Sequence, residues 1–366
     1  MSIRQIIFAV AVLVVLGVAS IMVLDQSWEG AGSGVGDKVL ADVPVNDITK
    51  IVIQQKDKTA TLEKVDGVWS VVEKEGYAAD FQRISSAVLL LRDLKVAKVI
   101  NAAPEAYGRL ELDDQRKTLV TCFDKTHGVV AKLSLGKEAV SKRQPPQQMY
   151  FGGSSNGRYV LADKASPVLV SDSLYQLSSE PFSWVDRQFI ALEKVKRIQM
   201  KSDWGISRED ENGDFSFQGA VPEKKEVDST KLNALASAFD YLTFEDVKKP
   251  AGEKVDQTLE VETFDGFVYT FDFVKAKGDK FVKISVKGNF VETRQPDKDE
   301  KPEEAVKLDK KFADNLIKLK EKLAKEQNVS NWLYKFSSSK NESILKTRDD
   351  LLKDKEEKKA VAEEHK

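Results

Sequence analysis

Two stretches of this chain carry the same pattern of apolar, turn and helix-start residues. In each stretch, apolar residues are spaced by three and then two positions, a Gly-x-aromatic turn follows, and an aspartate opens an amphipathic run. The matching positions are Ile48, Ile51, Ile53, Gly67, Trp69 and Asp80 in the first stretch and Val195, Ile198, Met200, Gly213, Phe215 and Asp228 in the second. The two sets are offset by about 147 residues, and a shared period indicates one supersecondary unit used twice. We therefore predict two tandem repeats, 43–180 and 194–352, joined by a linker at 181–193.

Each repeat is expected to be α+β, with an antiparallel sheet packed with one main helix. In the first repeat, the segments 48–54, 58–64 and 68–73 are typical of strands, and Asp66–Gly67 forms a tight turn between the last two. Asp80 is placed to cap a helix whose apolar stripe covers one face of the sheet. Strands and helices do not alternate regularly, so a doubly wound α/β fold is disfavoured.

Three segments fall outside this repeating pattern. The second repeat contains an inserted helix predicted at 303–327, because a partial apolar stripe runs through that segment. The glycine-rich stretch 25–42 is typical of a flexible tether. The end of the chain, 353–366, is almost entirely charged and has few apolar anchors, so we expect a frayed helix or a disordered tail.

The N-terminal segment 6–24 is an uncharged, predominantly aliphatic run. As a helix it would be roughly 28 Å long, which is close to the thickness of the hydrocarbon core of a bilayer. Arg4 precedes the run and Asp25 follows it, which predicts a cytoplasmic N-terminus (1–5) and an extracytoplasmic remainder. The alternative is a signal peptide cleaved near Ala19, but the run stays apolar past that site. We therefore expect a transmembrane helix.

Composition excludes several classes of function. The 57 basic and 59 acidic side chains are interspersed, so the chain has no basic field that would attract nucleic acid. Only two histidines are present, which excludes a histidine-rich metal site. Cys122 is the only cysteine, so no intramolecular disulfide can form, and its apolar neighbours predict a buried side chain rather than a reactive thiol. We expect neither a metal site nor a cofactor site.

One motif resembles a catalytic nucleophile. Residues 153–157 fit G-x-S-x-G, with Ser155 at the centre. That elbow requires a strand before it and a helix after it, whereas strand-like residues lie on both sides here, which predicts a hairpin. The usual order also requires a later histidine, and only His365 in the charged tail qualifies. The other histidine, His127, lies in a predicted turn without an identifiable partner. We assign no catalytic residue and expect the protein not to be an enzyme.

Three further segments could bind a ligand or a partner, but each has a simpler structural interpretation. Residues 210–214 are acidic like a calcium loop but lack its Gly and Glu spacing, so a hairpin turn is expected. Residues 144–148 form a polar loop that could dock a partner or simply connect two strands. The alternating aromatics Phe267, Tyr269, Phe271 and Phe273 could stack on sugars, although such a stripe more often packs in the core under a helix.

The order of several short motifs resembles a known bacterial family. These are the N-terminal run together with Asp47–Ile51, Asp66–Trp69, Ala106–Leu110, Trp184–Arg187, Trp332–Phe336 and Lys346–Leu351. They are similar to the domain of unknown function 4340, over most of residues 43–352. The resemblance implies a single-pass envelope protein, often encoded beside components of gliding-motility-type ABC transporters. It carries no catalytic residues.

From these observations we expect an anchored, extracytoplasmic accessory or scaffold subunit of an ABC-transporter-type assembly. The chain would lie in the bacterial inner membrane with its bulk in the periplasm, and its partners would be the ABC ATPase and permease subunits. An alternative is a module that binds an envelope polymer such as peptidoglycan or polysaccharide. An outward-facing aromatic stripe at 267–273 would favour that alternative.

Overall fold

A computed structural model describes residues 34–40, 43–139, 157–163, 165–201, 203–276, 278–296 and 300–355. The chain divides into two compact units, Met1–Val185 and Asp186–Lys366. Both are α+β, with antiparallel sheets and few helices. The predicted transmembrane segment 6–24 lies outside the described residues. Within the described ranges, no helix combines the length and the apolarity that crossing a bilayer requires.

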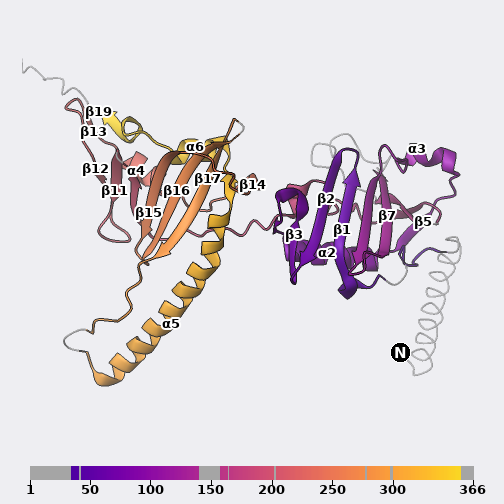
Figure 1. Cartoon of the computed structure of the whole chain (residues 1–366), viewed down its shortest axis with the longest axis horizontal. Coiled ribbons are helices and arrows are strands. Elements are labelled where there is room, and N and C mark those ends of the chain that lie inside the picture. Colours follow the sequence, from indigo (N-terminus) through magenta and orange to yellow (C-terminus); the bar gives the residue numbers. More distant parts are fainter. Residues whose placement is uncertain are drawn as a thin grey trace, which may run out of the picture. The chain divides into compact units, whose positions relative to one another are not determined.

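Unit 1 is built on a nine-stranded sheet with the order β4-β3-β2-β1-β6-β7-β8-β9-β5 (Figure 1). Its strands are β1 (Ile48–Gln55), β2 (Lys58–Val65), β3 (Val68–Val71), β4 (Tyr77–Ala78), β5 (Val96–Val99), β6 (Thr118–Asp124), β7 (Val129–Glu138), β8 (Arg158–Ala162) and β9 (Val168–Val170). Its helices are α2 (Phe81–Asp93) and the short α3 (Tyr107–Leu110), with 3-10 turns at Val45–Asp47, Val72–Lys74, Pro104–Ala106 and Pro181–Trp184.

Local sequence signals explain the start of this unit. Val65 pairs with Val68 across a two-residue turn in which Asp66 and Gly67 both have positive φ, at 50° and 85°. This is the backbone that matches the twist of a hairpin and that Asp-Gly tolerates. Asp80 accepts a 3.0 Å hydrogen bond from the amide of Arg83, as expected of the cap of α2.

Apolar burial then fixes α2 against the core. The helix buries Ile84, Ala87, Val88 and Leu91. Phe81, the first residue of the helix, lies three positions before Ile84 and so belongs to the same stripe by periodicity, but it is 63% exposed. The buried stripe therefore begins one turn later than the sequence pattern indicates.

The described part of the expected tether 25–42, residues 34–40, is hydrogen-bonded to unit 1. The amide of Gly36 donates to the carbonyl of Val96, and the amide of Val39 donates to the carbonyl of Leu94, each within 2.9 Å. Leu40 is buried. Residues 34–40 are therefore packed on unit 1, because buried apolar area and main-chain hydrogen bonds outweigh the flexibility of the glycines.

The expected linker 181–193 is divided between the two units. Trp184 is fully buried in unit 1, and its indole Nε1 donates a 2.8 Å hydrogen bond to the carbonyl of Ser178. The guanidinium of Arg83 lies 5.1 Å from the centre of the Trp184 ring. Ile190 and Leu192 are buried in unit 2.

Unit 2 contains an eight-stranded sheet with the order β12-β11-β10-β15-β16-β17-β18-β14 and a separate pair, β13-β19. Its strands are β10 (Val195–Met200), β11 (Trp204–Ser207), β12 (Ser216–Gln218), β13 (Lys225–Val227), β14 (Asp246–Lys248), β15 (Val255–Thr263), β16 (Phe267–Ala276), β17 (Asp279–Gly288), β18 (Leu333–Lys335) and β19 (Leu352–Asp354). Its helices are α4 (Ser229–Ser237), α5 (Pro302–Glu326) and α6 (Ser338–Ile344), with 3-10 turns at Gln327–Asn331 and Asp349–Leu351.

The aromatic stripe of β16 forms the core of this unit. Phe267, Tyr269, Phe271 and Phe273 are each at most 1% exposed. The ring of Phe271 packs edge-on against Phe239, just past the end of α4, at 5.5 Å between centroids. The interpretation of the stripe as core is confirmed, so it offers no surface for stacking sugars.

The first residues of the expected charged tail, 353–366, are part of the fold. Lys353 and Asp354, assigned from sequence to the tail 353–366, belong to β19 and pair with β13. The main-chain ladder is reinforced by a 3.2 Å ion pair between Lys353 and Glu226. Residues 356–366 lie outside the described part of the chain.

Candidate functional site

The catalytic pattern around Ser155 gains no support from the described residues. Ser155, the loop 144–148 and His365 all lie outside them. His127 lies in the turn between β6 and β7, where its amide donates to the carbonyl of Asp124. The carboxylate of Asp124 accepts hydrogen bonds from Thr126 and from the amide of Gly128, and the Thr126 hydroxyl is the main cause of its lowered pKa. These contacts form a turn that stabilises itself.

Cys122 and the acidic loop also have structural roles. Cys122 is fully buried, and desolvation raises the pKa of its thiol to about 12, so the nucleophilic thiolate is suppressed. The acidic segment 210–214 turns between β11 and β12, with the amide of Gly213 donating to the carbonyl of Asp210. Among the described residues, no group of three or more His, Cys, Asp and Glu side chains is arranged to hold a metal ion.

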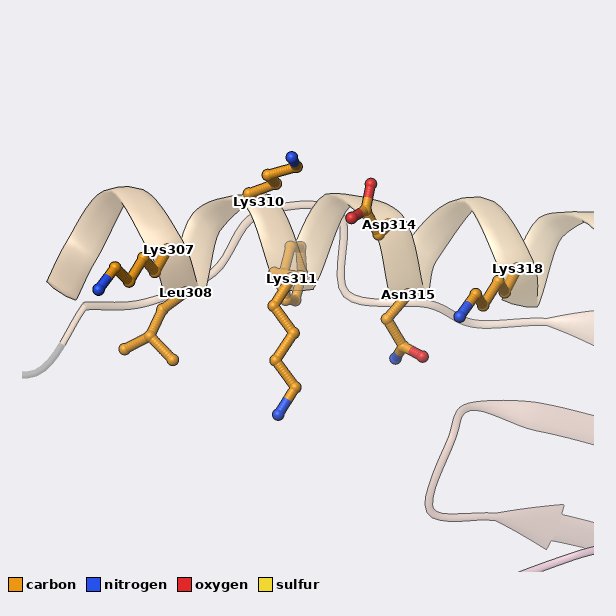
Figure 2. A pocket seen from close by; sticks show the side chains of 8 residues that line it. Lys307, Leu308, Lys310, Lys311, Asp314, Asn315 and Lys318 are labelled. Atoms are coloured by element: carbon orange, nitrogen blue, oxygen red, sulfur yellow. The ribbon is translucent and has the colours of Figure 1, made fainter. Parts of the chain in front are cut away.

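In unit 2, α5 is largely exposed, with Glu326 as its buried residue, and it extends beyond the ends of β15–β17 in Figure 1. A shallow hollow runs along it, and Figure 2 shows its lysines and Leu308 projecting from this one helix. The residues that line it are Lys307, Leu308, Lys310, Lys311, Phe312, Asp314, Asn315 and Lys318. A single helix cannot enclose a small molecule, so this surface is suited to contact with a macromolecule.

The C-terminal end of α5 is tied to the core by a buried carboxylate. Glu326 is 4% exposed, and it accepts hydrogen bonds from Tyr269 (2.7 Å) and from the amide of Ala191 (3.1 Å). Lys322 lies 3.9 Å from the same carboxylate and donates to the carbonyl of Ala191 at 2.7 Å. Burial, with Glu326 as a second cause, raises the pKa of Tyr269, so its hydroxyl stays protonated and donates.

The outer half of α5 is tied to the segment that precedes it. Arg294 makes two 2.7 Å hydrogen bonds to the carboxylate of Glu300 and a 2.8 Å bond to Asp309 on α5. The Glu300 bonds are the main cause of the raised pKa of Arg294, which remains charged. Paired at both ends, α5 presents its side chains from a fixed backbone.

A second candidate surface is a groove beside α4, which we call the α4 groove. Its smaller part has a volume of about 260 Å³ and its adjoining, larger part about 450 Å³. The two parts share Lys194 and Asp240. The smaller part is lined by Lys194, Val195, Arg208, Phe215, Asn233, Ala236, Ser237 and Asp240, and the larger part by Ile190, Ala191, Leu192, Glu193, Lys194, Asp240 and Tyr241.

Two cations in the α4 groove have different surroundings. Lys194 lies 3.3 Å from Asp265 and 3.8 Å from Glu211, and the charge of Asp265 is the main cause of its raised pKa. Arg208 instead donates its Nε hydrogen to the carbonyl of Val195 at 2.8 Å, with its guanidinium 4.7 Å from the centre of the Phe215 ring. The charge of Lys194 is therefore balanced within the protein, whereas that of Arg208 has only neutral contacts.

Neither Arg208 nor Glu326 was singled out from the sequence. Arg208 directly follows the end of β11 and Glu326 is the last residue of α5. Both have charged or polar neighbours in the sequence, and no motif distinguishes them from these neighbours.

Comparison with known proteins agrees with the motif order seen in the sequence. Neither a curated protein nor a solved structure matches the chain. The match to a family model extends from β3 of unit 1 to β15 of unit 2 and covers more than half of the chain. The chain belongs to the family described as Domain of unknown function (DUF4340), whose model matches residues 69–261.

Proposed function

We propose that this protein is a non-catalytic accessory or scaffold subunit of an ABC-transporter-type assembly in the bacterial envelope. In this proposal, segment 6–24 anchors the chain in the inner membrane and the two units lie in the periplasm. The chain has no Walker A motif that would make it the motor. The observation that carries the proposal is the surface of α5.

The surface of α5 combines exposed apolar side chains with unpaired charge. Val306 is 69% exposed, Ile317 56% and Leu308 37%. Within the described residues, four lysines around them make no ion pair or side-chain hydrogen bond; they are Lys307, Lys310, Lys311 and Lys318. Apolar side chains on a rigid, charged helix favour a protein partner, because burying them gains free energy once the helix is covered.

The chemistry of this surface points to one kind of partner. The unpaired lysines require acidic groups at the rim, and the exposed apolar side chains require an apolar patch at the centre. We propose that the occupant is the permease subunit, through an extracytoplasmic surface with an acidic rim and an apolar centre. A membrane anchor at 6–24 would hold α5 close to such a subunit, which raises its effective concentration.

We further propose that the two units are tandem repeats, as the sequence pattern predicts. Support comes from the strand orders of the two sheets, which correspond position by position. The order is β3-β2-β1-β6-β7-β8-β9-β5 in unit 1 and β12-β11-β10-β15-β16-β17-β18-β14 in unit 2. Support also comes from a register shift, which lies between Ile48 and Lys50 in β1 and between Val195 and Arg197 in β10. Bulges are specific features of a strand, so their recurrence at matching positions favours a common origin.

The test is a mild-detergent pull-down of the tagged, full-length chain from native membranes, with co-purifying proteins identified by mass spectrometry. We expect an ABC ATPase and a multi-span permease near stoichiometric amounts. A double variant, Lys310→Glu with Lys311→Glu, should lower their recovery about tenfold, which corresponds to roughly 1.4 kcal/mol of binding free energy. Lys125→Glu, which reverses an exposed and unpaired lysine in unit 1, is the matched control and should have no effect.

Two results would contradict the proposal. Recovery of the chain alone, from membranes that contain the transporter subunits, would oppose the accessory role and make peptidoglycan or polysaccharide binding the next assay. Equal losses in the α5 variant and the Lys125→Glu control would mean that general charge, rather than α5, governs the association.

A further inference from the structure

Arg208 is held in position by neutral groups alone. Its Nε donates to the carbonyl of Val195 at 2.8 Å, and its own amide donates to the carbonyl of Lys196 at 3.0 Å. Its guanidinium lies 4.7 Å from the centre of the Phe215 ring and 5.7 Å from that of Phe264. Stacking on two rings and one hydrogen bond fix the plane of the guanidinium, so little conformational entropy would be lost on binding a ligand.

No carboxylate among the described residues forms an ion pair with Arg208. Other arginines of the same unit have acidic partners: Arg197 pairs with Glu262 at 2.8 Å and Arg294 with Glu300 at 2.7 Å. The contacts of Arg208 occupy only its Nε hydrogen and its faces. Its terminal nitrogens therefore retain their donors beside the smaller part of the α4 groove.

Two neutral donors line the same part of the groove. Asn233 and Ser237 lie four residues apart on α4, so they share one face of the helix. Within the described residues, neither side chain makes a hydrogen bond to the protein. The terminal nitrogens of a guanidinium, an amide and a hydroxyl, none with a protein acceptor among the described residues, line one cavity of about 260 Å³.

We propose that the smaller part of the α4 groove binds the carboxylate group of a small molecule, with Arg208 as the main residue that binds it. The planar fork of a guanidinium matches a carboxylate through two parallel hydrogen bonds. Asp240 lines the same cavity and makes no ion pair among the described residues. The negative charge of Asp240 repels a phosphate dianion more strongly than a carboxylate monoanion, so the site should prefer a carboxylate.

Ligand-observed saturation-transfer NMR on the purified full-length chain in detergent tests this proposal. The probes are acetate and butyrate, with inorganic phosphate followed by its phosphorus line width. We expect transfer to both carboxylates, with dissociation constants on the order of millimolar, and no broadening of phosphate. The test needs no transporter partner, so its failure is separable from failure of the accessory role.

Variants then locate the site. Arg208→Lys keeps the charge but loses the fork, and should weaken carboxylate binding at least about tenfold. Ser237→Ala, an exposed helix position that tolerates alanine, should weaken it about threefold. Asp240→Asn should strengthen carboxylate binding and allow phosphate to bind. The matched control is Lys196→Gln, which removes a cation 5.7 Å from the same Phe264 ring but outside the cavity lining, and should leave binding unchanged.

Three outcomes would overturn the proposal. The first is that neither acetate nor butyrate receives saturation transfer from the protein. The second is that Arg208→Lys and Ser237→Ala both leave this transfer unchanged. The third is that the wild-type chain binds phosphate as strongly as it binds acetate. Near-ultraviolet circular dichroism of each variant establishes that it is folded before its binding is compared.

Discussion

The hydroxyl of Tyr269 donates a 2.7 Å hydrogen bond to the carboxylate of Glu326, and both side chains are almost completely buried. Tyr269 lies in the central strand β16, and Glu326 is the last residue of α5. The bond therefore joins the helix that carries the proposed docking surface to the core of unit 2. The acceptor, the carboxylate of Glu326, is a buried charge, so the loss of one hydrogen-bond donor to it lowers the stability of the fold.

We predict that Tyr269→Phe lowers the free energy of unfolding by about 1–3 kcal/mol, because it removes a donor from a buried carboxylate without changing the packing volume much. Urea denaturation of the full-length wild type and of the Tyr269→Phe variant measures this difference in the free energy of unfolding. Hydrogen exchange should also become faster at the amides of the last turn of α5, since that turn loses its tie to β16.

Tyr241→Phe is the matched control for this prediction. Tyr241 is 95% exposed, so the same chemical change should alter the free energy of unfolding by less than about 0.5 kcal/mol. Equal effects of the two substitutions would mean that the Tyr269–Glu326 bond contributes nothing to stability.

Trp184→Ala is predicted to destabilise unit 1 by about 3–5 kcal/mol. The side chain is fully buried, and its removal leaves a large cavity, an unpaired carbonyl at Ser178 and an unstacked Arg83. Differential scanning calorimetry should show a lower melting temperature for unit 1. Trp184→Phe preserves most of the volume and should cost less; an unchanged melting temperature in the alanine variant would show that the site is not part of the core.

The ion pair of Glu253 predicts a pH dependence of stability. The carboxylate of Glu253 accepts a 2.7 Å hydrogen bond from Lys248 and a 2.8 Å hydrogen bond from the amide of Ala251. The bond from Lys248 is the main cause of the lowered pKa of Glu253, which is about 2. Since the folded pKa lies below the unfolded value of 4.5, the stabilisation is present above pH 4.5 and is lost as the pH falls towards 2. We expect it to be about 1 kcal/mol, because the pair lies near solvent.

Urea denaturation between pH 7 and pH 2 tests this dependence. Glu253→Gln should be less stable than the wild type at pH 7, and the two should converge as the pH approaches 2. Glu209→Gln, at an exposed position without an ion pair among the described residues, serves as the control and should follow the wild type throughout. A difference between wild type and Glu253→Gln that persists at pH 2 would contradict the assignment.

Much of the fold could be predicted because its signals are local. Asp80 and Asp228 cap α2 and α4 because a short carboxylate reaches the open amides of the next turn without help from the rest of the chain. The alternation in β16 likewise predicts one buried face, which is where Tyr269 and Phe271 lie. Residues 34–40 were assigned to a tether because glycines dominate the local composition, but their packing depends on β5, more than 50 residues away.

The sequence by itself determined the antiparallel α+β class, the caps and turns, and the burial of the aromatic stripe. Periodicity and capping act within a few residues, so a single chain records them. Only the tertiary structure decided that Glu326 is buried and accepts a hydrogen bond from Tyr269, and that Arg208 lies near the rings of Phe215 and Phe264 without an acidic partner among the described residues. These arrangements depend on which distant segments pack together, and a charged residue acquires a specific role only once that packing sets its solvation and its partners.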